Sequence, residues 1–260
     1  MKKVMRQLKL SPMLDTLPER LALARQQHLS HAAFLELVLA DEATRRDASS
    51  AARRARAAGL DPAMRIDTWD DHAKVRYDRT VWTDLTSLRF LDAAHGAVIL
   101  GAVGVGKTHL ATALGHIAVR RRIPTLMLRA DAMFKRLRAS RLDNSTEAEM
   151  RRLAQVRLLI IDDFALQPLD ATATADFYEL VVARHQRNAT IVTSNRGPDK
   201  AHLFARTCAE VASKRDTFAL IRVQRDGRAV GHRRGDRRGR SSLLRVSSRT
   251  LPRRVSGRSY

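Results

Sequence analysis

The sequence predicts an α/β domain with helices on both faces of a parallel sheet, and three observations carry this prediction. Four short apolar runs are each long enough for a buried strand, and they end at residues 100, 128, 161 and 192. The intervals of 28, 33 and 31 residues between these ends suit a strand, a crossover helix and a return strand. A glycine-rich turn directly follows the first run and opens a predicted helix. The four runs occupy residues 97–100, 125–128, 158–161 and 190–192.

Length and composition agree with a soluble globular protein. The chain has 260 residues, of which 44% are hydrophobic, 5% aromatic and 29% charged, and a chain of this size can build a core without disulfides. No apolar run approaches the roughly 20 residues needed to cross a membrane, and the N-terminus lacks a secretion signal. We therefore expect a cytoplasmic protein with no membrane contact. The single cysteine, Cys208, excludes an intramolecular disulfide and a zinc site built from several cysteines.

Residues 1–60 are predicted to form a helical N-terminal region that binds DNA or a partner protein. Leucines at positions 14, 17 and 21 recur at helical spacing, Ser30 is placed as an N-cap, and Gly59 ends the pattern. The stretch from Arg45 to Arg56 is basic and rich in alanine. Such a stretch suits a helix lying against phosphates, and it suits a solvated helix face equally well.

Residues 61–95 are expected to connect this helical region to the sheet-containing core at 96–205. The connecting segment carries Trp69, which could stack on an adenine ring, although burial in a core is the more frequent fate of a tryptophan. Within the core, residues 108–121 are predicted to be helical because they are rich in alanine and leucine. Residues 172–187 are predicted to be helical because apolar residues recur there at helical spacing.

Positive charge is concentrated toward the C-terminus. The formal net charge is +21, and residues 201–260 contribute +12 of it through 15 Arg and one Lys against four acidic residues. This surplus makes a polyanion such as nucleic acid the first partner to expect, and the +9 of residues 1–200 supports the same partner. Residues 206–260 are predicted to be a disordered basic tail, since Arg, Gly and Ser without an apolar period cannot bury a core.

The turn after the first strand fits the pattern G-x-x-x-x-G-K-[ST]. Its glycines let the loop wrap around phosphate oxygens and turn backbone N–H groups inward, and the following helix N-terminus favours negative charge. Lys107 is expected to neutralise charge on the β- and γ-phosphates of a nucleotide, and the Thr108 hydroxyl to ligate Mg²⁺. The candidate nucleotide-binding residues are Gly101, Ala102, Val103, Gly104, Val105, Gly106, Lys107 and Thr108.

Polar residues follow two later strands of the predicted sheet. Asp162 and Asp163 come directly after residues 158–161, where Asp162 can hold Mg²⁺ directly or through water and Asp163 can orient or deprotonate an attacking water. Asn195 follows the fourth strand, so its amide can point at the γ-phosphate or at that water. The alternatives are two acidic helix caps and a turn-forming asparagine.

Other polar groups have simpler explanations. His109 and His116 lie on one face of a predicted helix without carboxylate or cysteine partners, so we expect packing or surface roles and no metal site. The run 120–122 suits the negative end of that helix, and DNA contact is the alternative. A second basic run, at Lys135, Arg136, Arg138 and Arg141, could follow a DNA backbone or form a solvated face.

Four segments together resemble the IstB-type AAA+ ATPases of insertion sequences, which are similar to the DnaC helicase loaders. These segments read GAVGVGKTHLA, LLIIDDF, IVTSNRGPD and, near the N-terminus, LKLSPMLDTLPERLALARQQHLSHAAFLELVLADE. The likeness covers roughly residues 7–205. It implies a P-loop AAA+ ATPase that uses ATP and Mg²⁺, assembles on duplex DNA as a homo-oligomer, and directs or stimulates the transposase of the same insertion sequence.

The family pattern also assigns roles to the residues singled out above. Lys107 and Thr108 match Walker A, Asp162 and Asp163 match Walker B, and Asn195 matches sensor 1. Asp163 stands where AAA+ proteins commonly have glutamate, so a shorter carboxylate would have to position the water and hydrolysis would be slow. The sequence after about Arg206 departs from the family, and we hypothesise that the reading frame shifts there.

Two other functions remain open from the sequence. A replicative helicase loader would share the ATPase core and bind single-stranded DNA and a helicase hexamer. A non-hydrolysing scaffold would bind ATP and DNA without turnover, which the aspartate at 163 and the atypical C-terminus make credible.

Overall fold

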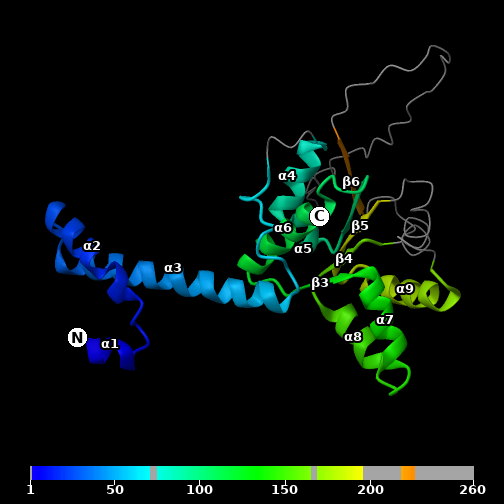
Figure 1. Cartoon of the computed structure of the whole chain (residues 1–260), viewed down its shortest axis with the longest axis horizontal. Helices are drawn as coiled ribbons and strands as arrows, with labels where there is room; N and C mark the ends of the chain where they lie inside the picture. Colours follow the sequence, from blue (N-terminus) through cyan, green and yellow to red (C-terminus); the bar gives the residue numbers. More distant parts are fainter. Residues whose placement is uncertain (1, 71–74, 165–168, 196–217, 226–260) are drawn as a thin grey trace, which may run out of the picture.

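A six-stranded sheet forms the centre of the computed structural model, which describes residues 2–70, 75–164, 169–195 and 218–225 (Figure 1). The strand order is β1-β6-β2-β5-β4-β3, with β1 antiparallel to β6 and every other pairing parallel. The four predicted strands are confirmed as β2 to β5. The bounds are β1 Val75–Arg76, β2 Gly96–Gly101, β3 Thr125–Arg129, β4 Leu158–Asp162, β5 Ala189–Ser194 and β6 Phe218–Arg225.

Helices cover both faces of the sheet and divide the core into two clusters. Ile160 of β4 packs in the cluster that contains Leu114 of α6, whereas Ile161 packs in the cluster that contains Phe177 of α9. Because both faces are covered, every residue of β4 is buried, which explains its unbroken apolar run. The helices of the connecting segment are α4 Arg79–Ser87 and α5 Arg89–Asp92, and those of the core are α6 Lys107–Arg120, α7 Ala130–Ser140, α8 Thr146–Gln155 and α9 Ala171–Arg184.

Three helices before the core form an N-terminal arm, defined here as α1 Lys2–Gln7, α2 Met13–Gln26 and α3 His31–Ala57. Figure 1 shows the arm extending away from the sheet, with only the C-terminal end of α3 reaching the core. The Ser30 hydroxyl accepts a hydrogen bond from the Ala33 N–H at 3.2 Å, which confirms the predicted N-cap. An ion pair of 2.6 Å between Arg20 and Asp41 joins α2 to α3.

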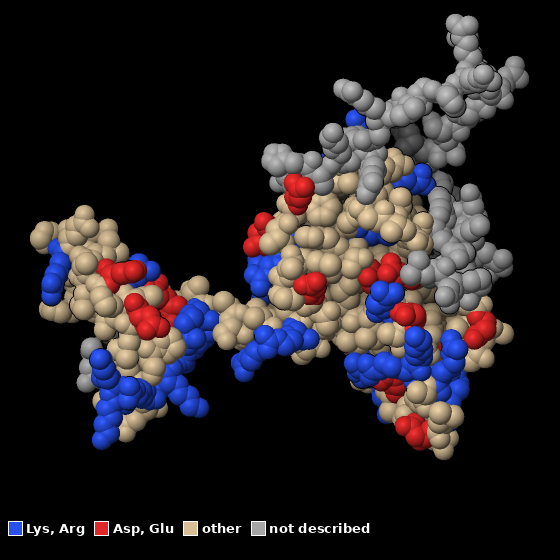
Figure 2. Space-filling view, in the orientation of Figure 1, with Lys and Arg blue, Asp and Glu red and all other residues tan. Residues whose placement is uncertain are grey.

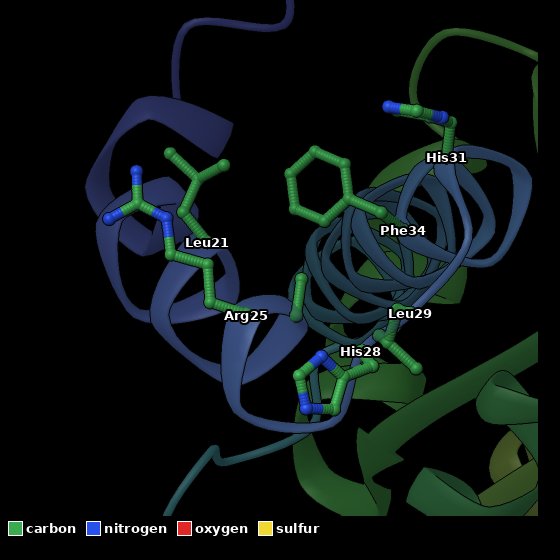
Figure 3. A pocket seen from close by; sticks show the side chains of 7 residues that line it. Leu21, Arg25, His28, Leu29, His31 and Phe34 are labelled. Atoms are coloured by element: carbon green, nitrogen blue, oxygen red, sulfur yellow. The ribbon is translucent and has the colours of Figure 1, made fainter.

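The arm leaves part of its apolar surface uncovered. Its α2–α3 end borders a hollow lined by Leu21, Phe34 and other side chains (Figure 3). Leu35 and Leu39 of α3 are 57% and 46% exposed.

No helix in the described ranges has both the length and the apolar character to span a membrane.

The end of α3 is fixed to the core at a left-handed glycine. Gly59 has φ +76°, and a Cβ there would lie 2.8 Å from the carbonyl oxygen of Met127 in β3. The neighbouring Ala58 carbonyl accepts a hydrogen bond from the Met127 N–H at 2.7 Å. The expected end of the helical pattern near Gly59 is therefore confirmed. The connecting segment that follows contains β1, α4 and α5.

One stretch corrects the prediction of a disordered tail over residues 206–260. Phe218–Arg225 form β6, which pairs in parallel with β2 from Gly96 opposite Phe218 to Gly101 opposite Val223. Ile221 and Val223 are fully buried, whereas Leu220 before them is 53% exposed and Arg222 between them is exposed, so the segment alternates as a strand does. Residues 206–217 and 226–260, including Cys208 and the hypothesised frame shift, lie outside the described residues.

Candidate nucleotide-binding site

The predicted phosphate loop joins β2 to α6 and depends on three glycines. Gly104 and Gly106 have φ values of +76° and +90°, a backbone conformation that L side chains rarely adopt. A Cβ on Gly101 would lie 2.3 Å from the carbonyl oxygen of Val223 in β6. The loop can therefore run beside β6 and turn into α6 only with glycine at these positions.

Lys107 is held inside this loop at the start of α6. The residue is 6% exposed, and its Nζ donates a hydrogen bond to the Ala102 carbonyl at 2.8 Å. Burial lowers the pKa of Lys107, while the charges of Asp163 and Asp162 oppose that shift. The ammonium group thus lies where loop, strand β4 and helix α6 meet.

Thr108, in the first turn of α6, contacts Asp162, the last residue of β4, although the two are far apart in the sequence. The Thr108 hydroxyl donates to the two carboxylate oxygens of Asp162 at 3.0 and 3.1 Å. Asp162 is 4% exposed. Hydroxyl and carboxylate oxygens are the donors that Mg²⁺ prefers, so this pair fits the metal that the sequence predicts.

Thr193 of β5 holds the acidic pair in place, and the sequence analysis missed it. Its hydroxyl donates to Asp162 Oδ1 at 2.5 Å and accepts the Asp163 N–H at 3.0 Å, and Thr193 is fully buried. Its carbonyl accepts the Phe164 N–H at 2.9 Å. No local sequence pattern marks this threonine, because its role depends on β5 lying beside β4. Parallel pairing of β4 with β5 brings the two ends together.

Asp163 is more exposed to solvent than Lys107 and Asp162. Its φ is +55°, which turns the chain sharply after β4, and its side chain is 29% exposed. Arg129, at the end of β3, places Nη1 3.8 Å from Asp163 Oδ2 and also pairs with Asp131 at 3.2 Å. The hydrogen bond with Asp131 is the main cause that raises the pKa of Arg129, and the charge of Asp163 adds to it. Arg129 is the second site residue that the sequence analysis missed.

Asn195 lies at the same edge of the sheet. Parallel pairing of β2 with β5 sets Leu100 opposite Ser194, so Asn195 is the first residue beyond that pair and is half-buried. The structure therefore joins Lys107, Thr108 and the acidic pair into one group and places Asn195 directly after the neighbouring strand β5. Its predicted role toward a γ-phosphate stays a prediction.

The outer side of the loop contacts the connecting segment. A Cβ on Gly106 would lie 2.6 Å from the ring of Trp69, which also makes an edge contact with His109 at 5.1 Å between ring centroids. His109 Nε2 lies 2.7 Å from the Arg65 carbonyl oxygen, and His116 Nε2 lies 2.8 Å from that of Asp61. Both histidines thus pack the connecting segment onto α6, as expected. Within the described ranges, no group of three His, Cys, Asp or Glu could hold a metal ion.

Proteins of insertion sequences are similar to this chain in sequence. An ATP-binding protein in an insertion sequence of Mycobacterium tuberculosis is 36% identical over 200 residues, which are 76% of this chain and 80% of that protein. An insertion-sequence ATP-binding protein of Sinorhizobium fredii is 35% identical over 192 residues, 74% of this chain and 77% of its own length.

A solved structure agrees with the predicted P-loop AAA+ fold. The replication initiator DnaA bound to AMPPCP and single-stranded DNA superposes with a TM-score of 0.51 at 19% identity, over 62% of this chain and 50% of that chain. The family model that matches this chain, over residues 3–204, is described as IstB-like ATP binding protein. The chain therefore belongs to the family of IstB-like ATP-binding proteins.

Proposed function

We propose that this chain binds ATP with Mg²⁺, assembles in that state on duplex DNA as a homo-oligomer, and recruits or stimulates the transposase of its insertion sequence. The observation that carries the proposal is the contact of Thr108 with Asp162 beneath a complete phosphate loop. Family membership supports the link to transposition, because relatives at 35–36% identity are named as insertion-sequence ATP-binding proteins.

Lys107 and the loop would bind the phosphates of ATP. The Lys107 ammonium would leave the Ala102 carbonyl, 2.8 Å away, and bind oxygens of the β- and γ-phosphates. The exchange replaces a neutral acceptor by a charged one, so it gains a stronger hydrogen bond. Backbone N–H groups of the loop and the start of α6 would bind the remaining phosphate oxygens.

Thr108 and Asp162 would hold the metal ion. Mg²⁺, when bound, supplies positive charge to the β- and γ-phosphate oxygens. Thr193 would keep the Asp162 carboxylate aimed at Thr108, since its hydroxyl bonds to Asp162 at 2.5 Å. We expect Asp162→Asn to weaken the Mg²⁺ dependence of ATP binding. An unaltered Mg²⁺ titration would remove Asp162 from the metal site.

Asp163 and Asn195 would act on the attacking water. Asp163 would accept a proton from it as the water oxygen bonds to the γ-phosphorus and the bond to the β-phosphate oxygen breaks, giving ADP and phosphate. Asn195 would donate its amide to the γ-phosphate.

A non-hydrolysing scaffold is the second candidate function. The ion pair of 3.8 Å between Asp163 and Arg129 favours it, because the guanidinium lies beside the carboxylate oxygen that would have to accept the proton of an attacking water. Multiple-turnover phosphate release that Asp163→Ala abolishes would exclude the scaffold. Stoichiometric ATP binding without release would support it.

Light scattering on DNA tests assembly. Large complexes on duplex DNA with ATP and small ones with ADP are expected from the proposal. Equal binding with either nucleotide would contradict nucleotide-driven assembly, and a preference for single-stranded DNA together with capture of a helicase hexamer would favour a helicase loader.

A further inference from the structure

Two surfaces of this protein are rich in arginine, and they differ in how their charge is neutralised. Over α7 and α8, the arginines form ion pairs, and Figure 2 shows red side chains beside the blue ones there. Such guanidinium groups already donate to carboxylates, so a phosphate would have to displace them. The pairs are Arg129–Asp131, Arg136–Glu149, Arg138–Asp170, Arg141–Asp176, Arg151–Glu147 and Arg152–Glu149.

The second group of arginines lies on the last turns of α3 and at the end of α6. Arg53, Arg56 and Arg120 are exposed, and none of them forms an ion pair with a residue in the described part of the chain. Arg121 is also exposed and donates to the neutral Ser87 carbonyl at 2.6 Å. This group of four arginines is called the α3–α6 surface below. Its cations are available to an anionic ligand.

The α3–α6 surface is fixed to the nucleotide-binding core. The Arg54 guanidinium donates to the Val119 carbonyl at 3.2 and 3.3 Å, and Arg122 pairs with Asp47 at 2.9 Å. These contacts tie α3 to the end of the same helix whose first residue is Lys107. A ligand on this surface would therefore keep a defined position relative to the phosphate loop.

The composition of this part of α3 favours a nucleic acid over a lipid surface. Residues 45–56 contain only Arg, Asp, Ala and Ser. A helix that lies in a membrane interface needs Trp, Phe or Leu on its apolar face, and none occurs there. Small alanine and serine side chains between the arginines allow a phosphate backbone to approach closely. Twelve residues of helix extend about 17 Å, beside which duplex DNA carries roughly ten phosphate charges.

We infer that the α3–α6 surface, and not the ion-paired surface of α7 and α8, binds the phosphate backbone of duplex DNA. The inference rests on the proposed function for DNA as the partner, and it assigns the surface that contacts it. Binding of this kind is independent of sequence and weakens steeply with salt.

The test compares two triple variants of the full chain on one labelled duplex. The first is Arg53→Gln/Arg56→Gln/Arg120→Gln, which leaves Arg54 and its contact with α6 intact. The matched control is Arg136→Gln/Arg138→Gln/Arg152→Gln, which removes the same formal charge from exposed positions on the other surface. Fluorescence anisotropy at several salt concentrations gives the slope of log K against log [salt], with ATP present throughout.

The first variant is expected to lower that slope by roughly 2 to 3 and to weaken binding at 0.1 M salt by at least about tenfold, because each lost phosphate contact removes about 0.9 from the slope. The control should change the slope by less than about 1. Equal effects of both variants, or no effect of the first, would overturn the inference. So would loss of binding to phosphatidylserine vesicles in the first variant while duplex binding is kept.

Two further readouts separate this inference from the proposed function. Both variants should keep the ATP affinity of the parent chain, since none of the six residues lies at the nucleotide site. The first variant should also keep the melting temperature, because its three arginines form no ion pair within the described residues. A parent chain that binds ATP and no duplex at any salt concentration would refute the proposed function. A parent that binds duplex through residues other than the α3–α6 surface would refute the inference alone.

Discussion

The nucleotide site and the α3–α6 surface are both rich in charge, yet they hold their charged groups in opposite ways. Lys107 and Asp162 are 6% and 4% exposed, and hydrogen bonds fix both. Arg53 and Arg56 on α3 are exposed to solvent. The difference indicates that single changes should be costly at the site, where each group depends on its neighbours. On the α3–α6 surface, single changes of exposed arginines should cost little, and function should depend on several residues together.

The largest expected effect is that of Lys107→Ala. Removing the buried cation deletes a charged hydrogen bond to phosphate, worth about 1.5–3 kcal/mol, so ATP affinity should fall roughly 10- to 150-fold. Isothermal titration calorimetry checks this, with Lys135→Ala at an exposed position as the matched control. Unchanged affinity would mean that the loop has only a structural role, which would break the comparison at its strongest point.

Thr193→Val sharpens the comparison within the site. The substitution keeps the shape but removes the hydroxyl that donates to Asp162 and accepts from the Asp163 N–H. At about 1–2 kcal/mol for such buried partners, the Mg²⁺ concentration for half-maximal ATP binding should rise roughly 5- to 30-fold. Thr193→Ser keeps a hydroxyl and should stay near the parent value. Equal behaviour of the two variants would show that the hydroxyl does not position Asp162.

Ser30→Ala gives the corresponding single change on the arm. It removes the hydroxyl that accepts the Ala33 N–H at the start of α3, at a cost of about 1 kcal/mol of helix stability. Thermal unfolding followed by circular dichroism should show this loss, while ATP affinity stays at the parent value. A matching fall in ATP affinity would mean that the arm and the site are not separable.

The smallest effect concerns pH. The hydrogen bond from Arg45 is the main cause that lowers the pKa of Glu42 from 4.5 to about 2. Burial opposes this shift, and the hydrogen bond from Arg46 adds to it. A carboxyl whose pKa is depressed in the folded state stabilises it fully above the ordinary value and loses that contribution as the pH falls toward 2. The stability of α3 should therefore decline between about pH 4.5 and 2. Glu42→Gln, compared by acid titration of helical circular dichroism, should flatten that decline.

The phosphate loop could be predicted because its requirements are local. Three glycines, a lysine and a threonine lie within eight residues, and a strand and a helix flank them. The acidic pair could be predicted for a similar reason, since it directly ends an apolar run. Thr193 could not, because its role depends on β5 lying beside β4, and no local pattern states which strands are neighbours.

The arginines show a second limit of sequence reasoning. Arg136 and Arg138, like Arg53 and Arg56, lie in a basic stretch of helix, but Glu149 of α8 and Asp170, the residue before α9, reach the first two. The strand β6 was missed because an arginine-rich background hides its alternation of buried Ile221 and Val223 with exposed side chains. In both cases the structural partner is distant in the sequence: Glu149 and Asp170 for the arginines, and β2 for β6.

The contact of Trp69 with Gly106 gives this protein an internal optical reporter. The chain has two tryptophans, and the other, Trp82, is buried in the core at 8% exposure. The emission of an indole ring depends on its surroundings. A phosphate that binds in the loop against which Trp69 packs should therefore shift the emission of Trp69 and leave that of Trp82 unchanged. A Trp82→Phe variant would then report nucleotide occupancy without any attached dye, in the same sample used for DNA binding.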